Sequence, residues 1–317
     1  MAELNLQSLS LDEGNLYLLM RSLSRINAFV KATTTDVVLR FGDGYISPVL
    51  ALFIRALRDE LEESVTNRRR LCFRMSDYAA HPEMQRFFQE SGLVQSMEKA
   101  SKDYLERIEY SRKGVNKKYS ATQPDQIVAP HRIDLIELQQ KTRKEQKLLL
   151  VNEASSVFSA LKSTYPAKDF AGLMSMLMEL FDNAIFHSHS RKAYSMAVRL
   201  RNGGYFVGIY DLGIGISGAY EQYRNKNENY LSLPRKTDQE AILWAMEEGH
   251  STLQGDKDYP RGAGFSRIKD FISDYGGRIM IASNNGYYYF EAGGEDIPAA
   301  LEDKIQGTLF TMFLPAS

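Results

Sequence analysis

Apolar residues at the start of the chain switch between short continuous runs and helical spacing. The pattern predicts, in order, a helix over 14–30, a strand over 36–41, a helix over 47–63, a strand over 71–75 and a helix over 82–90. Ser47 can cap the second of these helices, and Pro48 suits its first turn. Strands that alternate with helices in this way indicate a small α/β domain.

A stretch over 121–137 is interpreted as a linker that separates this first domain, 1–120, from a second one, 138–317. The second domain is predicted to hold a long polar helix over 138–163, an amphipathic helix over 170–187, a hairpin of strands 195–200 and 205–210, a helix over 265–275 and a final strand around 307–311. The connection 216–261 carries one helical piece, 238–248. A connection of this length suits a mobile lid.

Length and charge narrow the class of protein. At 317 residues the chain is longer than one ordinary domain, which agrees with the division into two. Its 39 basic and 40 acidic side chains nearly cancel, which argues against a protein that works mainly on nucleic acid. The basic stretch 99–118 is interpreted as a solvated connecting helix rather than a nucleic-acid contact.

Cysteine usage and hydropathy exclude further classes. Cys72 is the only cysteine, so it can form no internal disulfide and cannot by itself hold a structural zinc. No basic-then-apolar leader opens the chain, and no apolar run approaches the ~18–20 residues of a membrane helix. We therefore expect a cytoplasmic protein without membrane association.

The amphipathic helix carries a polar stripe. At about 100° per residue, Glu179 and Asn183 lie opposite the apolar face that is centred on Phe181. Solvent exposure is the ordinary explanation, but Met176 and Phe186 flank the stripe and can cover it. A carboxylate can orient or deprotonate a water, and an amide oxygen one turn away can bind magnesium.

Asp211 ends the apolar face of the second hairpin strand and is followed by Gly213 and Gly215. A carboxylate in that position is costly to bury unless it accepts hydrogen bonds. Small residues beside it let a planar ligand approach the backbone, so an adenine amino group is the expected donor. A plain aspartate–glycine turn explains the same residues equally well.

A second glycine turn, Gly262-Ala-Gly264, leads into the helix over 265–275. The free N–H groups and the dipole at a helix start suit phosphate oxygens, and Arg261 adds a formal charge. A simple helix-entry turn is the alternative.

The order of these segments is more specific than any one of them. The chain reads Glu179-Leu-Phe-Asp-Asn183, then Asp211-Leu-Gly-Ile-Gly215, then Gly262-Ala-Gly264-Phe, and finally Gly307-Thr308-Leu-Phe-Thr. Over about 140–317 it resembles the GHKL superfamily of gyrase, heat-shock chaperone, histidine kinase and mismatch-repair ATPases. The resemblance implies an α/β sandwich in which helices cover a mixed sheet, with ATP held between the helices and a lid.

The resemblance also implies roles for individual residues. Asn183 would coordinate Mg²⁺, Glu179 would act as general base or orient water, and Asp211 would bind the adenine amino group with Thr308 beside it. The glycines at 213 and 215 would line the adenine pocket, and those at 262 and 264 would meet the phosphates. Because many members dimerise, a homodimer is a further implication.

Some residues depart from the family pattern. Phe265 stands where leucine is usual. His187 fits one form of the motif, four residues after the asparagine, although we favour a hydrogen-bonded helix-end residue. No histidine lies in a dimerisation-helix context, and His131 does not match one. An ordinary autophosphorylating sensor kinase is therefore not expected.

The first domain resembles STAS-type regulatory domains of anti-sigma-factor antagonists in element order alone, since no serine lies in the family's phosphoacceptor context. Together these points predict an Mg²⁺-dependent ATP-binding regulatory protein. It would hydrolyse ATP slowly or transfer its phosphate to a protein partner, and the first domain would be the regulatory or partner-binding part.

Two alternatives stay open. One is a nucleotide-gated binding module without turnover. The other is an adenosyl-methionine methyltransferase, which the turn after Asp211 also suggests. The methyltransferase is the less favoured of the two, because that fold places its glycine turn after its first strand, directly before a helix. Here a hairpin precedes the turn, and the helix that carries Glu179 comes earlier still.

Overall fold

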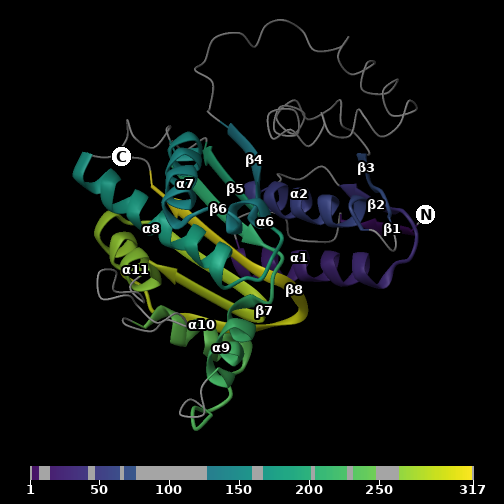
Figure 1. The fold of residues 1–317 in the computed structure, drawn as a ribbon. Coiled ribbons are helices and arrows are strands. Elements are labelled where there is room, and N and C mark those ends of the chain that lie inside the picture. Colours follow the sequence, from purple (N-terminus) through teal and green to yellow (C-terminus); the bar gives the residue numbers. More distant parts are fainter. Residues whose placement is uncertain are drawn as a thin grey trace, which may run out of the picture. The chain divides into compact units, whose positions relative to one another are not determined.

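The computed structural model describes residues 2–6, 15–41, 47–64, 68–75, 127–158, 167–200, 204–226, 231–247 and 264–315. The chain divides into two compact units, Met1–Pro130 and His131–Ser317 (Figure 1). The division falls inside the stretch that was interpreted as a linker. That interpretation is wrong for its second half, where the structure has strand β4 (Ile127–Asp134) followed by helix α6 (Leu135–Gln139).

The first unit is a small parallel α/β arrangement. Strands β1 (Ala2–Asn5), β2 (Val37–Phe41) and β3 (Leu71–Met75) pair in that order, and both pairings are parallel. Helix α1 (Leu16–Ala32) joins β1 to β2, and helix α2 (Pro48–Glu62) joins β2 to β3. The predicted strands and helices between 14 and 75 are confirmed, whereas β1 was missed. The predicted helix over 82–90 and the basic stretch 99–118 lie outside the described residues.

Side-chain caps explain where these helices begin. Asn15 Oδ1 accepts a hydrogen bond from Leu18 N at 3.0 Å, and Ser47 Oγ accepts one from Val49 N at 3.2 Å. Ser47 is the N-cap of α2 and Pro48 its first residue, as the sequence predicts.

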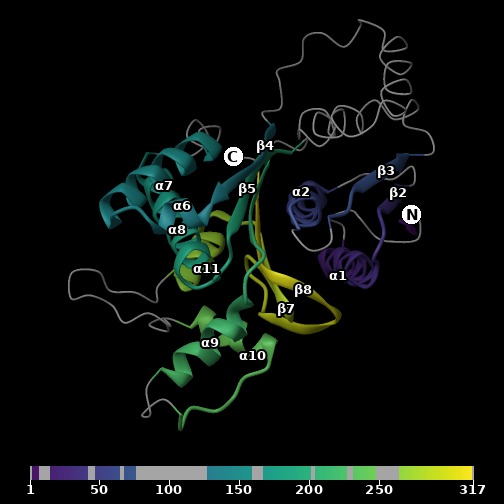
Figure 2. The same ribbon diagram turned by 45° about the vertical axis from the view of Figure 1, so that its right-hand side comes forward.

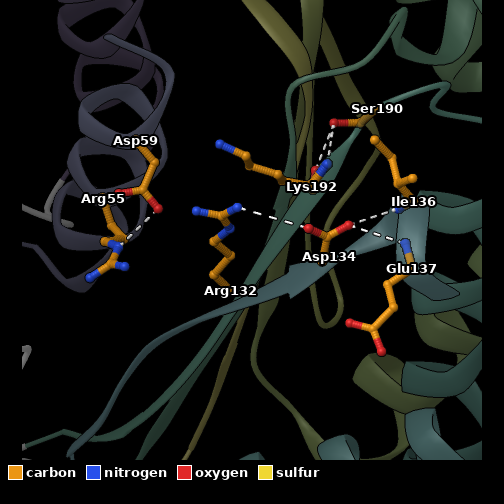
Figure 3. Close-up of polar contacts among 8 residues, drawn as sticks. All are labelled: Arg55, Asp59, Arg132, Asp134, Ile136, Glu137, Ser190 and Lys192. Atoms are coloured by element: carbon orange, nitrogen blue, oxygen red, sulfur yellow. Dashed lines mark hydrogen bonds and ion pairs between the residues drawn. The ribbon is translucent and has the colours of Figure 1, made fainter. Parts of the chain in front are cut away.

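Asp59 is a buried acid on α2. Its carboxylate accepts a hydrogen bond from Arg55 Nε (Figure 3) and one from Arg58 Nη2, both at 3.3 Å. The two guanidinium groups thus compensate a charge that is only 5% exposed.

The second unit is built on a five-stranded sheet of order β4-β5-β6-β8-β7. Its other strands are β5 (Lys192–Arg199), β6 (Tyr205–Asp211), β7 (Arg278–Glu291) and β8 (Ile297–Leu314). The pairs β5–β6, β6–β8 and β8–β7 are all antiparallel. The mixed character that the sequence analysis expected is not seen in these three pairs, while the predicted hairpin of β5 and β6 is confirmed.

Helices cover one face of this sheet. α6, α7 (Arg143–Phe158), α8 (Ala167–Phe186) and α11 (Gly264–Tyr275) lie on the same side of it, and α9 (Gly215–Asn225) and α10 (Asp238–Met246) lie at one end (Figure 2). In the described part of the chain, no helix combines the length and the apolar character that crossing a membrane requires.

Polar contacts fix the edge where β4, α6 and β5 meet. Asp134 caps α6, since its Oδ1 accepts from Ile136 N at 3.0 Å and from Glu137 N at 3.2 Å (Figure 3). The N–H of Leu135 donates to the carbonyl of Arg191, just before β5, at 3.0 Å. These bonds fix the start of α6 and attach it to the residue that precedes β5.

The single polar helix predicted over 138–163 is wrong in detail. The structure has two helices there, α6 and α7, with a break over 140–142. Thr142 and Glu145 form the hydrogen bonds of a capping box, with Glu145 Oε2 accepting from Thr142 N at 2.8 Å and Thr142 Oγ1 accepting from Glu145 N at 3.4 Å. The signal Thr-x-x-Glu was present in the sequence and was missed.

The connection predicted as a lid contains more structure than expected. Helix α9, which was not predicted, begins at Gly215, and α10 begins at a capping box formed by Thr237 and Glu240. The Tyr220 ring on α9 meets the Trp244 ring on α10 edge-on, with 4.9 Å between centroids. Residues 215–247 therefore include two packed helices rather than one helical piece in an open loop.

Candidate functional site

Asp211 is buried at the end of β6, as its position after an apolar row predicts. It is 6% exposed and lies opposite Thr308 of β8 in the antiparallel register. Its Oδ1 accepts a hydrogen bond from Gly213 N at 2.8 Å. Burial raises the pKa of this carboxyl from 3.8 to about 7, although the backbone N–H groups of Gly213 and Thr308 favour the charged form. A buried acid that titrates near neutrality is typical of functional sites.

The glycines around Asp211 are needed for close backbone packing. A Cβ on Gly213 would lie 1.9 Å from the carbonyl oxygen of Ser188, and one on Gly215 would lie 2.4 Å from Asn284 Nδ2. The sequence analysis explained Gly213 and Gly215 by ligand approach. The structure supplies a different reason, because both Cβ directions point into the protein itself.

Gly307 is a third crowded glycine, and it allows a direct test. Its φ is +78°, and an added Cβ would lie 2.0 Å from the carbonyl oxygen of Asp211. Gly293 has nearly the same φ, +77°, but nothing within 4 Å of an added Cβ. Gly293→Ala is expected to cost about 1 kcal/mol, the left-handed backbone strain alone. Gly307→Ala should cost about 3 kcal/mol more, because backbone must move. Urea unfolding of the full chain measures both, and equal losses would contradict the close packing.

A polar network behind the Asp211 turn was missed by the sequence analysis. Ser283 Oγ accepts from Ile216 N at 2.9 Å and lies 3.2 Å from Thr308 Oγ1. Asn284, at φ +53° in a β-bulge, donates through Nδ2 to Ile214 O at 3.0 Å. The polar run Ser283-Asn284-Asn285-Gly286 within a strand was the available signal. This network holds the turn and the start of α9 against β7.

Helix α8 places Glu179 and Asn183 at a half-buried surface. Its apolar face is buried as predicted, with Leu173, Leu177, Phe181, Ala184 and Ile185 each at most 3% exposed. Met176, which flanks the polar stripe, is 5% exposed, and both Glu179 and Asn183 are intermediate. The stripe is thus partly covered, and full solvent exposure does not describe it.

The end of α8 is joined to the Asp211 turn. Ile214 N donates to the carbonyl of Ser188 at 2.8 Å, two residues after the helix ends. Asn183 lies three residues, or about 4.5 Å, before α8 ends at Phe186. The stripe of Asn183 and Glu179 therefore begins near the end of α8 that is joined to the Asp211 turn, and it runs away from that end along the helix. His187 lies just after the helix, and its N–H donates to Asn183 O at 3.0 Å.

Glu179 forms an ion pair with a residue of helix α11. Arg267 Nη1 of α11 lies 3.4 Å from Glu179 Oε1, and the side chains are 54% and 33% exposed. Burial raises the pKa of the Glu179 carboxyl, Arg267 lowers it, and Asp182 raises it. Arg267 was not singled out in the sequence, where it appears as one cation in an amphipathic helix.

The remaining predicted residues are only partly described. Gly264 is the first residue of α11, in agreement with a glycine at a helix start, whereas Arg261 and Gly262 lie outside the described residues.

The chemical types of these side chains suit a complex of Mg²⁺ and a nucleotide. A buried carboxylate can accept from a purine amino group, an amide oxygen is a hard ligand, and Mg²⁺ commonly takes one or two protein ligands plus phosphates and waters. None of the described residues offers a hydrogen bond to Asn284 Oδ1, which is buried beside the turn. Among the described residues, no group of three or more His, Cys, Asp or Glu side chains is arranged to hold a metal.

Comparison with known proteins gives no further information about this site, because no family model, no curated protein and no solved structure matches the chain.

Proposed function

We propose that the chain is an Mg²⁺-dependent ATP-binding regulatory protein of the GHKL type. It would hydrolyse ATP slowly or transfer the γ-phosphate to a protein partner. The observation that carries the proposal is the buried carboxylate of Asp211, next to Thr308 and joined through Ser188 to the helix that bears Glu179 and Asn183.

Each residue has a task that its surroundings support. Asp211, when ionised, would accept a hydrogen bond from the exocyclic amino group of the base. The Asn183 side-chain oxygen would hold the metal, and the half-buried Glu179 would orient a water or take a proton from the attacking group. Bound Mg²⁺–ATP would supply the phosphoryl group and neutralise its charge.

The support for a regulatory role of the first unit comes from its order of strands and helices. Its three parallel strands with α1 and α2 support the STAS-like comparison only at the level of element order. We propose that this unit binds the protein partner.

Substitution of Asp211 tests nucleotide recognition. Asp211→Asn keeps the size of the side chain but removes the charged acceptor, so ATP affinity at pH 8 is expected to fall about 10- to 100-fold, the value of a hydrogen bond to a charged group. Isothermal calorimetry of the full chain with Mg²⁺–ATP measures this. Asp303→Asn, which changes an acid on β8 that is only partly exposed, is the control and should bind like wild type.

The outcomes separate the candidate functions. No heat with wild-type protein at millimolar ATP overturns the proposal. Binding without turnover favours the nucleotide-gated module, for which the two packed helices after Gly215 offer a surface beside the site. The methyltransferase alternative is weakened by the antiparallel hairpin that precedes Asp211.

A further inference from the structure

The ion pair between Glu179 and Arg267 connects the two helices that border the proposed site. Glu179 belongs to α8 and Arg267 to α11, and the pair is separated by 88 positions in the sequence. The contact joins Arg267 Nη1 to Glu179 Oε1 at 3.4 Å. The pair therefore restricts the orientation of a carboxylate that needs one defined direction to act on a water.

The pair is not explained by stability. Arg267 is 54% exposed, and ion pairs at that exposure contribute little to the folding free energy because water screens them. Lys269, two residues later on α11, forms a comparable pair with Asp296 at 2.7 Å on another side of the helix. α11 thus carries two surface ion pairs on different sides, of which the Arg267 pair reaches the α8 stripe.

The position of Arg267 along α11 adds a second link. α11 begins at Gly264, so Arg267 lies three residues, or about 4.5 Å, into the helix. A helix start is a natural anion site, and a phosphate bound there would contact the same first turn that presents Arg267. The first turn of α11 would then both contact the nucleotide and, through Arg267, orient the Glu179 carboxylate.

We propose that Arg267 is a positioning residue, which holds the Glu179 carboxylate in the orientation required for phosphoryl transfer. The inference rests on the proposed function. A positioning role predicts a lower kcat with little change in KM, because the guanidinium acts on the carboxylate rather than on the bound nucleotide.

Steady-state phosphate release by the full chain tests this role. Arg267→Ala is expected to lower kcat about tenfold and to change KM for ATP less than twofold, and Arg267→Lys should restore part of the rate. In a Glu179→Gln background, Arg267→Ala should have no further effect, since the group that it positions is gone. Lys269→Ala is the matched control and should keep the wild-type kcat.

Several results would overturn the inference. A raised KM with unchanged kcat would make Arg267 a nucleotide-binding residue, and an effect that adds to that of Glu179→Gln would make it independent of Glu179. An unchanged rate in Arg267→Ala would reject the role while leaving the proposed function intact. Wild-type protein that binds ATP but neither releases phosphate nor labels a protein from γ-labelled ATP would reject both the turnover and the positioning role.

Discussion

Changing Glu179 to glutamine is expected to lower the rate of phosphate release from ATP by about 100-fold or more, the usual contribution of a general base. Glutamine keeps the size of the side chain and can still contact Arg267, but it cannot accept a proton. Because Glu179 is not placed at the Asp211 end of the site, ATP affinity should stay within about threefold of wild type. Phosphate release and calorimetric binding, measured on the same preparation, give both values.

A carboxylate on the neighbouring helix provides the control for this change. Asp270 is an exposed acid on α11, three residues beyond Arg267, and Asp270→Asn should turn over ATP like wild type. Equal rates for Glu179→Gln and wild type would show that Glu179 has no catalytic role. If the protein then still responded to ATP, the nucleotide-gated module would be the better description.

Changing Asp211 to asparagine is expected to make the nucleotide-free protein more stable at neutral pH. The folded-state pKa of Asp211 is raised to about 7 from the ordinary value of 3.8. A raised carboxyl pKa means that the folded state binds the proton more tightly than the unfolded state. The free energy of unfolding of the wild type is therefore unaffected by this group below pH 3.8 and falls as the pH rises from 3.8 towards 7. Above pH 7 the wild type carries the whole cost of a buried charge, about 4 kcal/mol at about 1.4 kcal/mol per pKa unit.

Urea unfolding of both proteins without nucleotide, at several values between pH 5 and pH 8, measures this effect. The stability of Asp211→Asn relative to wild type should increase with pH up to about pH 7 and then level off, because asparagine does not ionise. A difference that stays constant over this range would show that the acid is not buried as a charge. Together with the loss of ATP affinity, a rise in stability would mark Asp211 as a residue kept for binding at the expense of folding.

Much of the local structure could be predicted because its signals lie within a few residues. Ser47 and Pro48 start α2 where expected, and Leu71–Met75 is a strand with the predicted bounds. The hairpin of strands 195–200 and 205–210 was predicted from two apolar strands close in sequence, and β5 and β6 pair antiparallel. The missed break before α7 was also a local signal, in Thr142 and Glu145, that was overlooked.

Other elements had no adequate local signal. β1 is four residues long with a polar alternation that many loops share, and it is a strand because β2 supplies its hydrogen bonds. α9 begins at a glycine with φ +75°, without a side-chain cap, and its first turn is held by Ser283 from a distant strand. Contacts over 67 positions cannot be deduced from neighbouring residues.

By itself, the sequence determined which residue types were available for chemistry and which faces of their elements they occupy. Periodicity placed Glu179 and Asn183 on one stripe of α8, and alternation placed Asp211 at the buried end of a strand, because backbone geometry repeats with fixed periods. Only the tertiary structure decided what these groups meet. Pairing of β6 with β8 brings Thr308 opposite Asp211, and packing of α11 beside α8 brings Arg267 to Glu179. Burial and partner charges, which set pKa and orientation, arise from such distant neighbours and not from the local chain.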